Sequence, residues 1–111
     1  MLPGRCVRIY LSESDQIDGK PAMESILALC QQAGLRGVSV LRATEGLGAH
    51  GVHTTSFLSL SSDLPLLVEA IDTEERINHA LEIMRPHLGP HLVAVWPVSL
   101  MKGEWNDDND A

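Results

Sequence analysis

The order in which apolar side chains recur along this chain is the feature that most restricts its fold. Four segments alternate between apolar and polar residues, as half-buried strands do, and two repeat every three to four residues, as amphipathic helices do. Strands are expected at residues 6–11, 37–43, 66–71 and 92–98, and helices at residues 21–33 and from residue 73 to about residue 86. The chain therefore runs strand, helix, strand, strand, helix, strand, with a long gap between the second and third strands.

Turn and capping residues mark the ends of both expected helices. Pro21 suits a first helical position, where its missing N–H costs nothing, and Gly34 suits the left-handed position after the last turn. Asp72 is expected to cap the N-terminus of the second helix, and Pro86 and Gly89-Pro90 are expected to end that helix.

This element order predicts an α+β, ferredoxin-like βαββαβ sandwich with a long loop between the second and third strands. Right-handed crossovers place both helices on one face of the sheet. The other face carries apolar residues such as Leu67, Ile71 and Trp96, and monomers rarely leave such a patch exposed. We therefore expect a symmetric homo-oligomer to bury that face. Arg8 and Glu69 are expected to form a cross-strand pair on it.

The charge balance and the cysteine content restrict the class of function. The formal net charge is −7, which disfavours binding to nucleic acid and to anionic membranes. No apolar run approaches the ~18 residues of a membrane span, and the N-terminus lacks the apolar run of a secretory signal. Cys6 and Cys30 are expected to be reduced thiols in a cytoplasmic protein. Residues 1–101 are expected to form the domain, and residues 102–111 an acidic, disordered tail.

The side chains best suited to chemistry form no recognisable catalytic or metal-binding pattern. Five histidines are present, but a zinc site needs three or four converging ligands, and no cysteine is near His50 or His53 in sequence. Cys30 lies on the apolar stripe of the first helix, which indicates packing rather than nucleophilic attack. The sequence therefore assigns no catalytic residue and no metal ligand, and we do not expect an enzyme.

The glycine-rich stretch from Gly46 to Gly51 is the most informative candidate site. Glycines allow backbone N–H groups to approach an anion closely. The stretch is not a Walker loop, because it lacks Gly-Lys-Ser/Thr, and it is not a dinucleotide fingerprint, because it leads into a strand-like segment. We expect a hairpin-like excursion. Residues 45–56 have few apolar anchors, so we expect them to be mobile without a ligand.

Several short motifs, in a fixed order, resemble a known family. A run of three motifs is similar to the start of the regulatory loop of PII signalling proteins: Leu35-Arg36-Gly37-Val38-Ser39-Val40, then Glu45-Gly46-Leu47-Gly48, then Gly51 with His53-Thr54. Val95-Trp96-Pro97-Val98 is similar to their last strand. More closely, residues 5–100 resemble the PII-like family numbered 190 among the domains of unknown function. Further motifs that carry this resemblance are Arg8-Ile9-Tyr10, Glu13-Ser14-Asp15, Ala33-Gly34, Leu41-Arg42, Asp63-Leu64-Pro65 and Asp72-Thr73-Glu74-Glu75-Arg76.

The resemblance implies a ligand-sensing regulatory protein that forms a homotrimer, with ligands held in clefts between neighbouring subunits. In PII proteins the ligand is an adenine nucleotide, and the long loop, here residues 45–62, then engages a membrane transporter or a regulatory target protein. Gly46, Leu47 and Gly48 match the loop base that touches the nucleotide, and Ser39 matches a hydroxyl residue beneath it.

Two departures from the PII pattern bear on the ligand. The turn before the last strand, where PII proteins carry a lysine, contains His87, Gly89 and His91, and only Lys102 stands for the arginines that follow that strand. A triphosphate needs several cationic donors, so a small anion or a less charged adenine nucleotide is expected. We expect it to bind against Gly46–Gly48 of one chain and this turn of a neighbour or of the same chain. The imidazoles add charge only when protonated, near pH ~6.5 for an unperturbed side chain, so binding should weaken as the pH rises.

Two other functions stay open at this point. One is a metal-binding trimer of the copper-tolerance type, which shares the fold. The other is an enzyme with its site in the intersubunit cleft. Metal analysis of the purified protein separates the first from a regulator, and the second requires activity on a defined substrate, because a fold does not confer a function.

Overall fold

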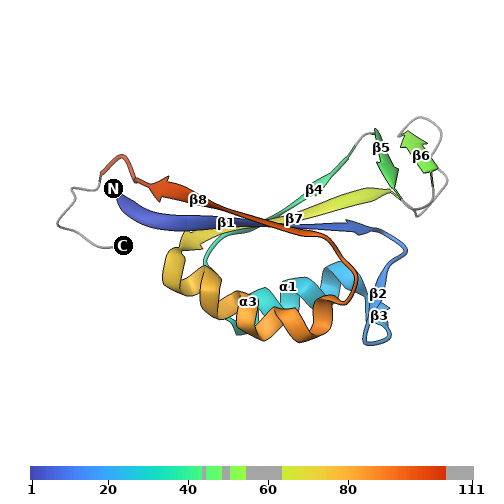
Figure 1. Ribbon diagram of the computed structural model, residues 1–111, viewed down its shortest axis with the longest axis horizontal. Coiled ribbons are helices and arrows are strands. Elements are labelled where there is room, and N and C mark those ends of the chain that lie inside the picture. Colours follow the sequence, from blue (N-terminus) through green and yellow to red (C-terminus); the bar gives the residue numbers. More distant parts are fainter. Residues whose placement is uncertain (44, 49–50, 55–63, 105–111) are drawn as a thin grey trace.

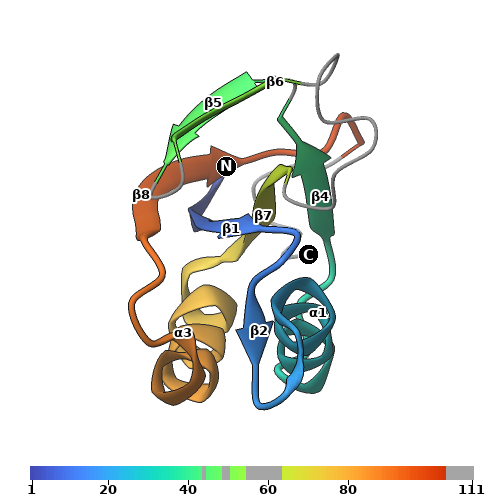
Figure 2. The ribbon, with the colours of Figure 1, turned by 90° about the vertical axis from the view of Figure 1, so that its right-hand side faces the viewer.

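Two helices cover one face of a four-stranded antiparallel sheet (Figure 1). This computed structural model describes residues 1–43, 45–48, 51–54 and 64–104. The sheet has the strand order β4-β7-β1-β8, so that β7 and β1 lie in its middle. Figure 2 shows both helices below the sheet and the β5–β6 hairpin on the opposite side. The predicted α+β, ferredoxin-like architecture is confirmed.

The observed elements follow the predicted order, with the expected glycine-rich hairpin and one unpredicted small hairpin between the first strand and the first helix. Their bounds are β1 Leu2–Ser12, β2 Gln16–Ile17, β3 Lys20–Pro21, α1 Ala22–Gln32, β4 Val38–Arg42, β5 Glu45–Gly48, β6 Gly51–Thr54, β7 Pro65–Thr73, α3 Glu74–Leu88 and β8 Val93–Leu100. The first strand is longer than predicted because its N-terminal half pairs with the end of β8, a long-range contact that local alternation does not report.

The core lies between the helices and the inner face of the sheet. Val7, Ile9 and Leu11 alternate along β1 and are buried there, as the period of two predicts. The helices contribute Ile26, Cys30 and further apolar residues from α3 to the same cluster. Burial raises the pKa of the Cys30 thiol to about 11, so this cysteine is a packing residue, as expected.

The sequence predicted the end of α1 correctly, but not its first residue. After α1 the Gly34 N–H donates to the Gln31 carbonyl and the Leu35 N–H donates to the Cys30 carbonyl, which is the Schellman arrangement, and Gly34 has the predicted positive φ of 79°. Pro21 is the N-cap residue of α1 and not its first helical residue.

The predicted N-cap of the second helix is wrong. Thr73 caps α3, since its Oγ1 accepts the Arg76 N–H at 3.3 Å. Asp72 is buried and interacts instead with Arg36. Pro86 does not end α3 but lies within its last turn. Its missing N–H removes one backbone hydrogen bond near a terminus where the helix continues for only two more residues.

A short hairpin at residues 16–21 was not predicted. Gln16 and Ile17 pair with Pro21 and Lys20, and Asp18-Gly19 makes the two-residue turn with φ values of 55° and 78°. Positive φ at both central residues is the type I′ geometry that favours Asp-Gly. The Asp-Gly dipeptide could therefore have predicted this turn from the sequence.

The outer face of the sheet, turned away from the helices, carries the predicted ion pair. Arg8 and Glu69 are directly opposite each other on β1 and β7, and Arg8 Nε donates to Glu69 Oε2 at 3.0 Å. The Arg8 guanidinium also lies 5.5 Å from the centre of the Trp96 ring. Large apolar side chains surround the pair and are 37–45% exposed: Tyr10, Leu41, Ile71 and Trp96.

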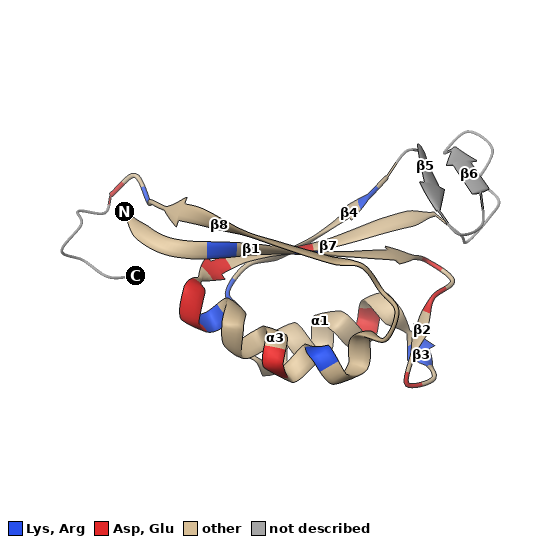
Figure 3. Ribbon diagram, viewed as in Figure 1, with Lys and Arg blue, Asp and Glu red and all other residues tan. Residues whose placement is uncertain are grey.

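The outer face is thus an apolar surface around one partly buried ion pair. Figure 3 shows that the strands are largely uncharged along their length. Among the described residues, no helix is long and apolar enough to cross a membrane.

Candidate ligand-binding site

A buried carboxylate organises one end of the sheet. Asp72, at the end of β7, is 3% exposed. Its Oδ2 accepts the Arg36 backbone N–H at 3.0 Å, and its Oδ1 accepts Arg36 Nη2 at 2.7 Å and the Thr73 N–H at 2.8 Å. Arg76 Nε lies 3.8 Å from the same oxygen. Burial alone would raise the pKa of this carboxyl, but the hydrogen bonds and the charge of Arg36 outweigh it and hold the pKa below its ordinary value.

A cleft of 370 Å³ opens beside this carboxylate. It is lined by Arg36, Gly37, Ile71, Asp72, Leu100, Met101 and Lys102. These residues come from the loop before β4, the end of β7 and the end of β8, which the antiparallel register brings to the same end of the sheet. Arg36 remains 43% exposed although it is bound to Asp72. We call this feature the cationic cleft.

The end of β8 forms one wall of the cationic cleft, and its position depends on close packing at Gly4. A Cβ atom at Gly4 would lie 2.7 Å from Leu100 Cγ and 2.8 Å from the Asp72 carbonyl oxygen, both too close for a real side chain. The absence of a side chain at Gly4 therefore lets the end of β8 pack against β1 and β7. Lys102 follows directly on this anchored strand end.

The charge in this region contrasts with that of the whole chain. Arg36 and Arg76 lie against the carboxylate of Asp72, and Lys102 lines the same cleft as Arg36, in a protein whose formal net charge is −7. A local excess of cations next to a partly apolar wall suits an anion that also has an apolar or aromatic part. Of these residues, sequence analysis identified only Lys102. Arg36 was missed because an arginine in a loop has no periodic signal, and Asp72 was misread as a helix cap.

The glycine-rich segment forms the predicted hairpin. Gly46, Leu47 and Gly48 lie in β5 and pair with His53, Val52 and Gly51 of β6. Figure 1 shows this hairpin at the opposite end of the sheet from the termini, beside which the cationic cleft lies. The predicted mobility of residues 45–56 is not tested, and residues 49–50 and 55–63 lie outside the described residues.

Ser39 lies between these two ends. It is opposite Glu69 in the β4–β7 register, and it therefore shares a row across the outer face with Glu69 and Arg8. Ser39 therefore adds a hydroxyl to the outer face on β4, the strand that runs from the cationic cleft toward the β5–β6 hairpin.

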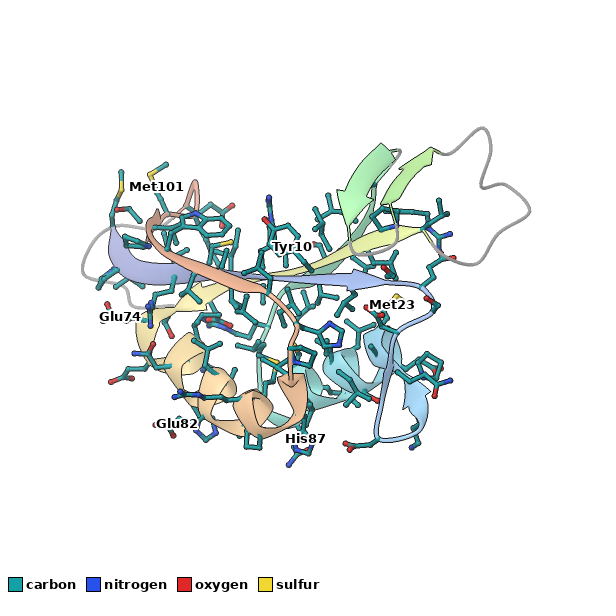
Figure 4. All side chains as sticks on the ribbon, turned by 45° about the vertical axis from the view of Figure 1, so that its right-hand side comes forward. Tyr10, Met23, Glu74, Glu82, His87 and Met101 are labelled. Carbon is teal, nitrogen blue, oxygen red and sulfur yellow. The ribbon has the colours of Figure 1, made fainter. Side chains whose placement is uncertain are left out.

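The turn of residues 87–91 contacts a different part of the chain. His87 Nδ1 is 3.0 Å from Asp18 Oδ2, and His91 Nδ1 is 3.7 Å from Asp15 Oδ2. Gly89 has φ 53° and ends α3. Figure 4 shows His87 at the end of the helix layer, while β5 and β6 lie on the other side of the sheet. Whether the turn and Gly46–Gly48 hold one ligand together stays a prediction.

Among the described residues, no three His, Cys, Asp or Glu side chains are placed to hold a metal ion. Cys6 and Cys30 are both buried free thiols. Burial raises the pKa of Cys6, with a smaller contribution from Glu69. The acidic tail after residue 104 lies outside the described residues, so the predicted tail stays a prediction.

Comparison with known proteins agrees with this architecture. Residues 4–100 match the family model DUF190, described as Uncharacterized ACR. A UPF0166 protein of Methanocaldococcus jannaschii is 32% identical over 81 residues, which cover 73% of this chain and 75% of that protein.

Two solved structures show the same fold at low sequence identity. A putative PII-like signaling protein from Thermus thermophilus has a TM-score of 0.65 and 20% identity, with 93% of this chain and 94% of that chain covered. CPII, a nitrogen regulatory PII-like protein from Thiomonas intermedia K12 that was solved bound to ADP, AMP and bicarbonate, has a TM-score of 0.62 and 22% identity, with 86% of each chain covered. The likeness shows the fold.

Proposed function

This chain belongs to the DUF190 family, and from that premise we propose that it is a PII-like ligand-sensing regulatory protein. It acts as a homotrimer that holds a small anion or an adenine nucleotide in clefts between subunits. It signals through the loop of residues 45–62 to a membrane transporter or a regulatory target protein. It is cytoplasmic and has no enzymatic activity of its own.

The observation that carries this proposal is the position of the cationic cleft relative to the glycine-rich hairpin. The two features lie at opposite ends of the sheet in one chain (Figure 1). A ligand that contacts both must therefore lie between two subunits, with the Arg36–Lys102 end of one chain facing the Gly46–Gly48 end of another. An intersubunit site is the arrangement that the family resemblance implies.

The outer face of the sheet supports the oligomer. Four large side chains on it, those of Tyr10, Leu41, Ile71 and Trp96, keep more than a third of their surface exposed in the single chain. Burying them against a second copy would remove this surface from water, at ~25 cal/mol for each Å² of apolar area. Among the described residues, the two helices lie on the inner face, so neither of them covers the outer face.

The number of cations supports a ligand of low charge. Arg36 already interacts with Asp72, which neutralises part of its charge, and Lys102 adds one more cation to the cleft. Arg36, partly neutralised by Asp72, and Lys102 together suit a monophosphate, a diphosphate, or a small carboxylate or carbonate better than a triphosphate. CPII, with which this chain shares its fold, was solved with ADP, AMP and bicarbonate, and these are the first ligands to test.

Isothermal titration calorimetry with AMP, ADP and bicarbonate tests the proposal. Lys102→Gln is expected to weaken the binding of AMP or ADP about tenfold, since one charge-assisted contact to phosphate is lost. The matched control is Arg85→Gln, which removes an exposed cation from α3, and it should bind as the wild type does.

Light scattering on the same samples measures the oligomer. A trimer that binds at least one of the three ligands supports the proposal. A monomer at micromolar concentration, or equal affinity of Lys102→Gln and wild type, would show that the cationic cleft is not part of an intersubunit site.

A further inference from the structure

Two histidine–aspartate contacts join the end of α3 to the β2–β3 hairpin. His87 Nδ1 lies 3.0 Å from Asp18 Oδ2, and His91 Nδ1 lies 3.7 Å from Asp15 Oδ2. The first pair connects residues 69 positions apart in the chain. Both pairs lie on the helix side of the sheet, away from the outer face, so neither is needed for the oligomer or for the cationic cleft.

The aspartates are presented by a segment whose backbone is tied down. Asp15 Oδ2 accepts the Ser12 N–H at 2.8 Å, and the Asp15 carbonyl accepts the Ala22 N–H at 2.8 Å. Asp18 occupies the tight type I′ turn. Asp15 is the charged group that the observed contacts place against His91, whose side chain is only 15% exposed. Because the carboxylates are already positioned, pairing with them costs less side-chain entropy than pairing two free long chains.

Charged groups from three elements line a groove beside His87. The groove, of 810 Å³, is lined by His87 of α3, by Asp18 and Lys20 of the β2–β3 hairpin and by Glu24 of α1. Arg85 is two residues earlier on α3, and side chains with that spacing do not face each other. Asp18 is the charged group that the observed contacts place against His87.

We propose that these two contacts form a pH-sensitive clamp on the turn of residues 87–91. When both imidazoles are protonated, each pairs with a carboxylate and the turn is tied to the β2–β3 hairpin. When the protons are lost as the pH rises, the charge attraction is lost and at most a neutral hydrogen bond is left. Histidine is the side chain whose charge ordinarily changes within the physiological range.

The consequence for ligand binding rests on the proposed function and on the sequence-based prediction that the turn of residues 87–91 contacts the ligand. The clamp then orders that turn at low pH, and ligand affinity falls as the pH rises because the turn loosens. This differs from direct attraction of an anion by the imidazoles, because the charge of each histidine acts on an aspartate of the same chain.

Hydrogen exchange measures the clamp without any ligand. The probes are the backbone amides of Leu88, Gly89, His91 and Leu92; the His91 N–H donates to the Leu88 carbonyl at 3.1 Å. Protection factors, corrected for the intrinsic rate, are compared at about pH 5.5 and about pH 8, on either side of the pH at which a histidine ordinarily changes charge. In the wild type, protection at the lower pH should be about two- to fivefold higher for each pair that contributes.

The decisive variant is the double change Asp15→Asn and Asp18→Asn. Asparagine keeps an acceptor oxygen for the Ser12 N–H and tolerates the positive φ at position 18, so the hairpin is retained while both charges are lost. The control is His79→Gln, which removes an exposed histidine from the same helix.

The clamp is supported if the double variant loses the pH dependence of protection and His79→Gln keeps it. It is overturned if the wild type shows no pH dependence in these amides, or if the double variant keeps it. Titration of AMP at both pH values forms a separate arm. Failure of AMP to bind at either pH counts against the proposed function, while the exchange data still decide the clamp.

Discussion

Replacing Asp72 gives the sharpest test of how the candidate site is built. Asp72 is 3% exposed and accepts three hydrogen bonds of 3.0 Å or less, two from backbone N–H groups and one from the Arg36 guanidinium. Asp72→Ala leaves two backbone donors without their acceptor, at ~1–1.5 kcal/mol each. The lost Arg36 pair adds little more than ~1 kcal/mol, because that side chain is 43% exposed and water can solvate it.

These contributions sum to a loss of about 3–4 kcal/mol in the free energy of unfolding. Asp72→Asn keeps one acceptor oxygen and should lose about half as much. With a urea m-value of ~1.5–2 kcal/mol/M, the alanine variant should unfold at a urea concentration lower by about 2 M. The measurement is urea unfolding followed by circular dichroism at one fixed protein concentration, since an oligomer is stabilised by mass action.

The pH dependence supplies the second half of this test. The folded pKa of Asp72 lies below its unfolded value, so its contribution is fully present above the unfolded pKa of ~3.9 and is lost as the pH falls through the folded pKa. The gap between wild type and Asp72→Asn should therefore be constant near neutral pH and shrink below pH ~4. Glu82→Gln, at an exposed carboxylate of α3, is the matched control and should change stability by no more than ~0.5 kcal/mol.

Two results would refute this reasoning. The first is an Asp72→Ala variant within ~0.5 kcal/mol of the wild type at neutral pH, which would mean that water replaces the three hydrogen bonds at no cost. The second is a gap that stays constant as the pH falls well below ~4, which would mean that the ionised form of Asp72 is not the form that matters.

Three further outcomes follow from the structure. Glu69→Gln removes the charge partner of Arg8. The loss in unfolding free energy should be ~3–5 kcal/mol if an oligomer buries the outer face, but only ~0.2–1 kcal/mol if water covers it. Chemical unfolding combined with light scattering distinguishes the two cases. Gly48→Val should abolish ligand binding in calorimetry while the hairpin persists, because valine favours strands but fills the space beside the backbone; equal affinity would place the site elsewhere. Gly4→Ala should lower stability by ~1–3 kcal/mol in thermal or urea unfolding, since the new Cβ overlaps Leu100 and a backbone carbonyl, and a neutral effect would show that the end of β8 can move away.

Local patterns were sufficient to predict the layers of this protein. The alternation of Val7, Ile9 and Leu11 identified the face of β1 that meets the helices, and the same alternation placed Arg8 opposite Glu69 once the strand order was inferred. Gly34 marked the end of α1 because a left-handed residue there is a local requirement. These features were predictable because each depends on neighbours within a few residues, or on a strand order that the fold class dictates.

Local patterns failed where a polar side chain had two plausible partners. Asp72 matched a capping pattern with the residues after it, but the tertiary structure directs its carboxylate to Arg36, and Thr73 caps α3 in its place. The contact of His87 with Asp18 was likewise not predicted, while its predicted contact with a ligand stays a prediction. Both partners, Arg36 and Asp18, are distant in sequence, so no local rule identifies them.

The sequence by itself determined which residues are helical or extended, which faces are apolar, and which family the chain resembles. The tertiary structure alone decided that Arg36, Asp72 and Lys102 share one cleft, and that this cleft and the glycine-rich hairpin lie at opposite ends of the sheet. The physical reason is that periodicity and turn chemistry act over a few residues, whereas the composition of a cleft depends on strand register and on side-chain competition for buried partners, which exist only once distant segments have paired.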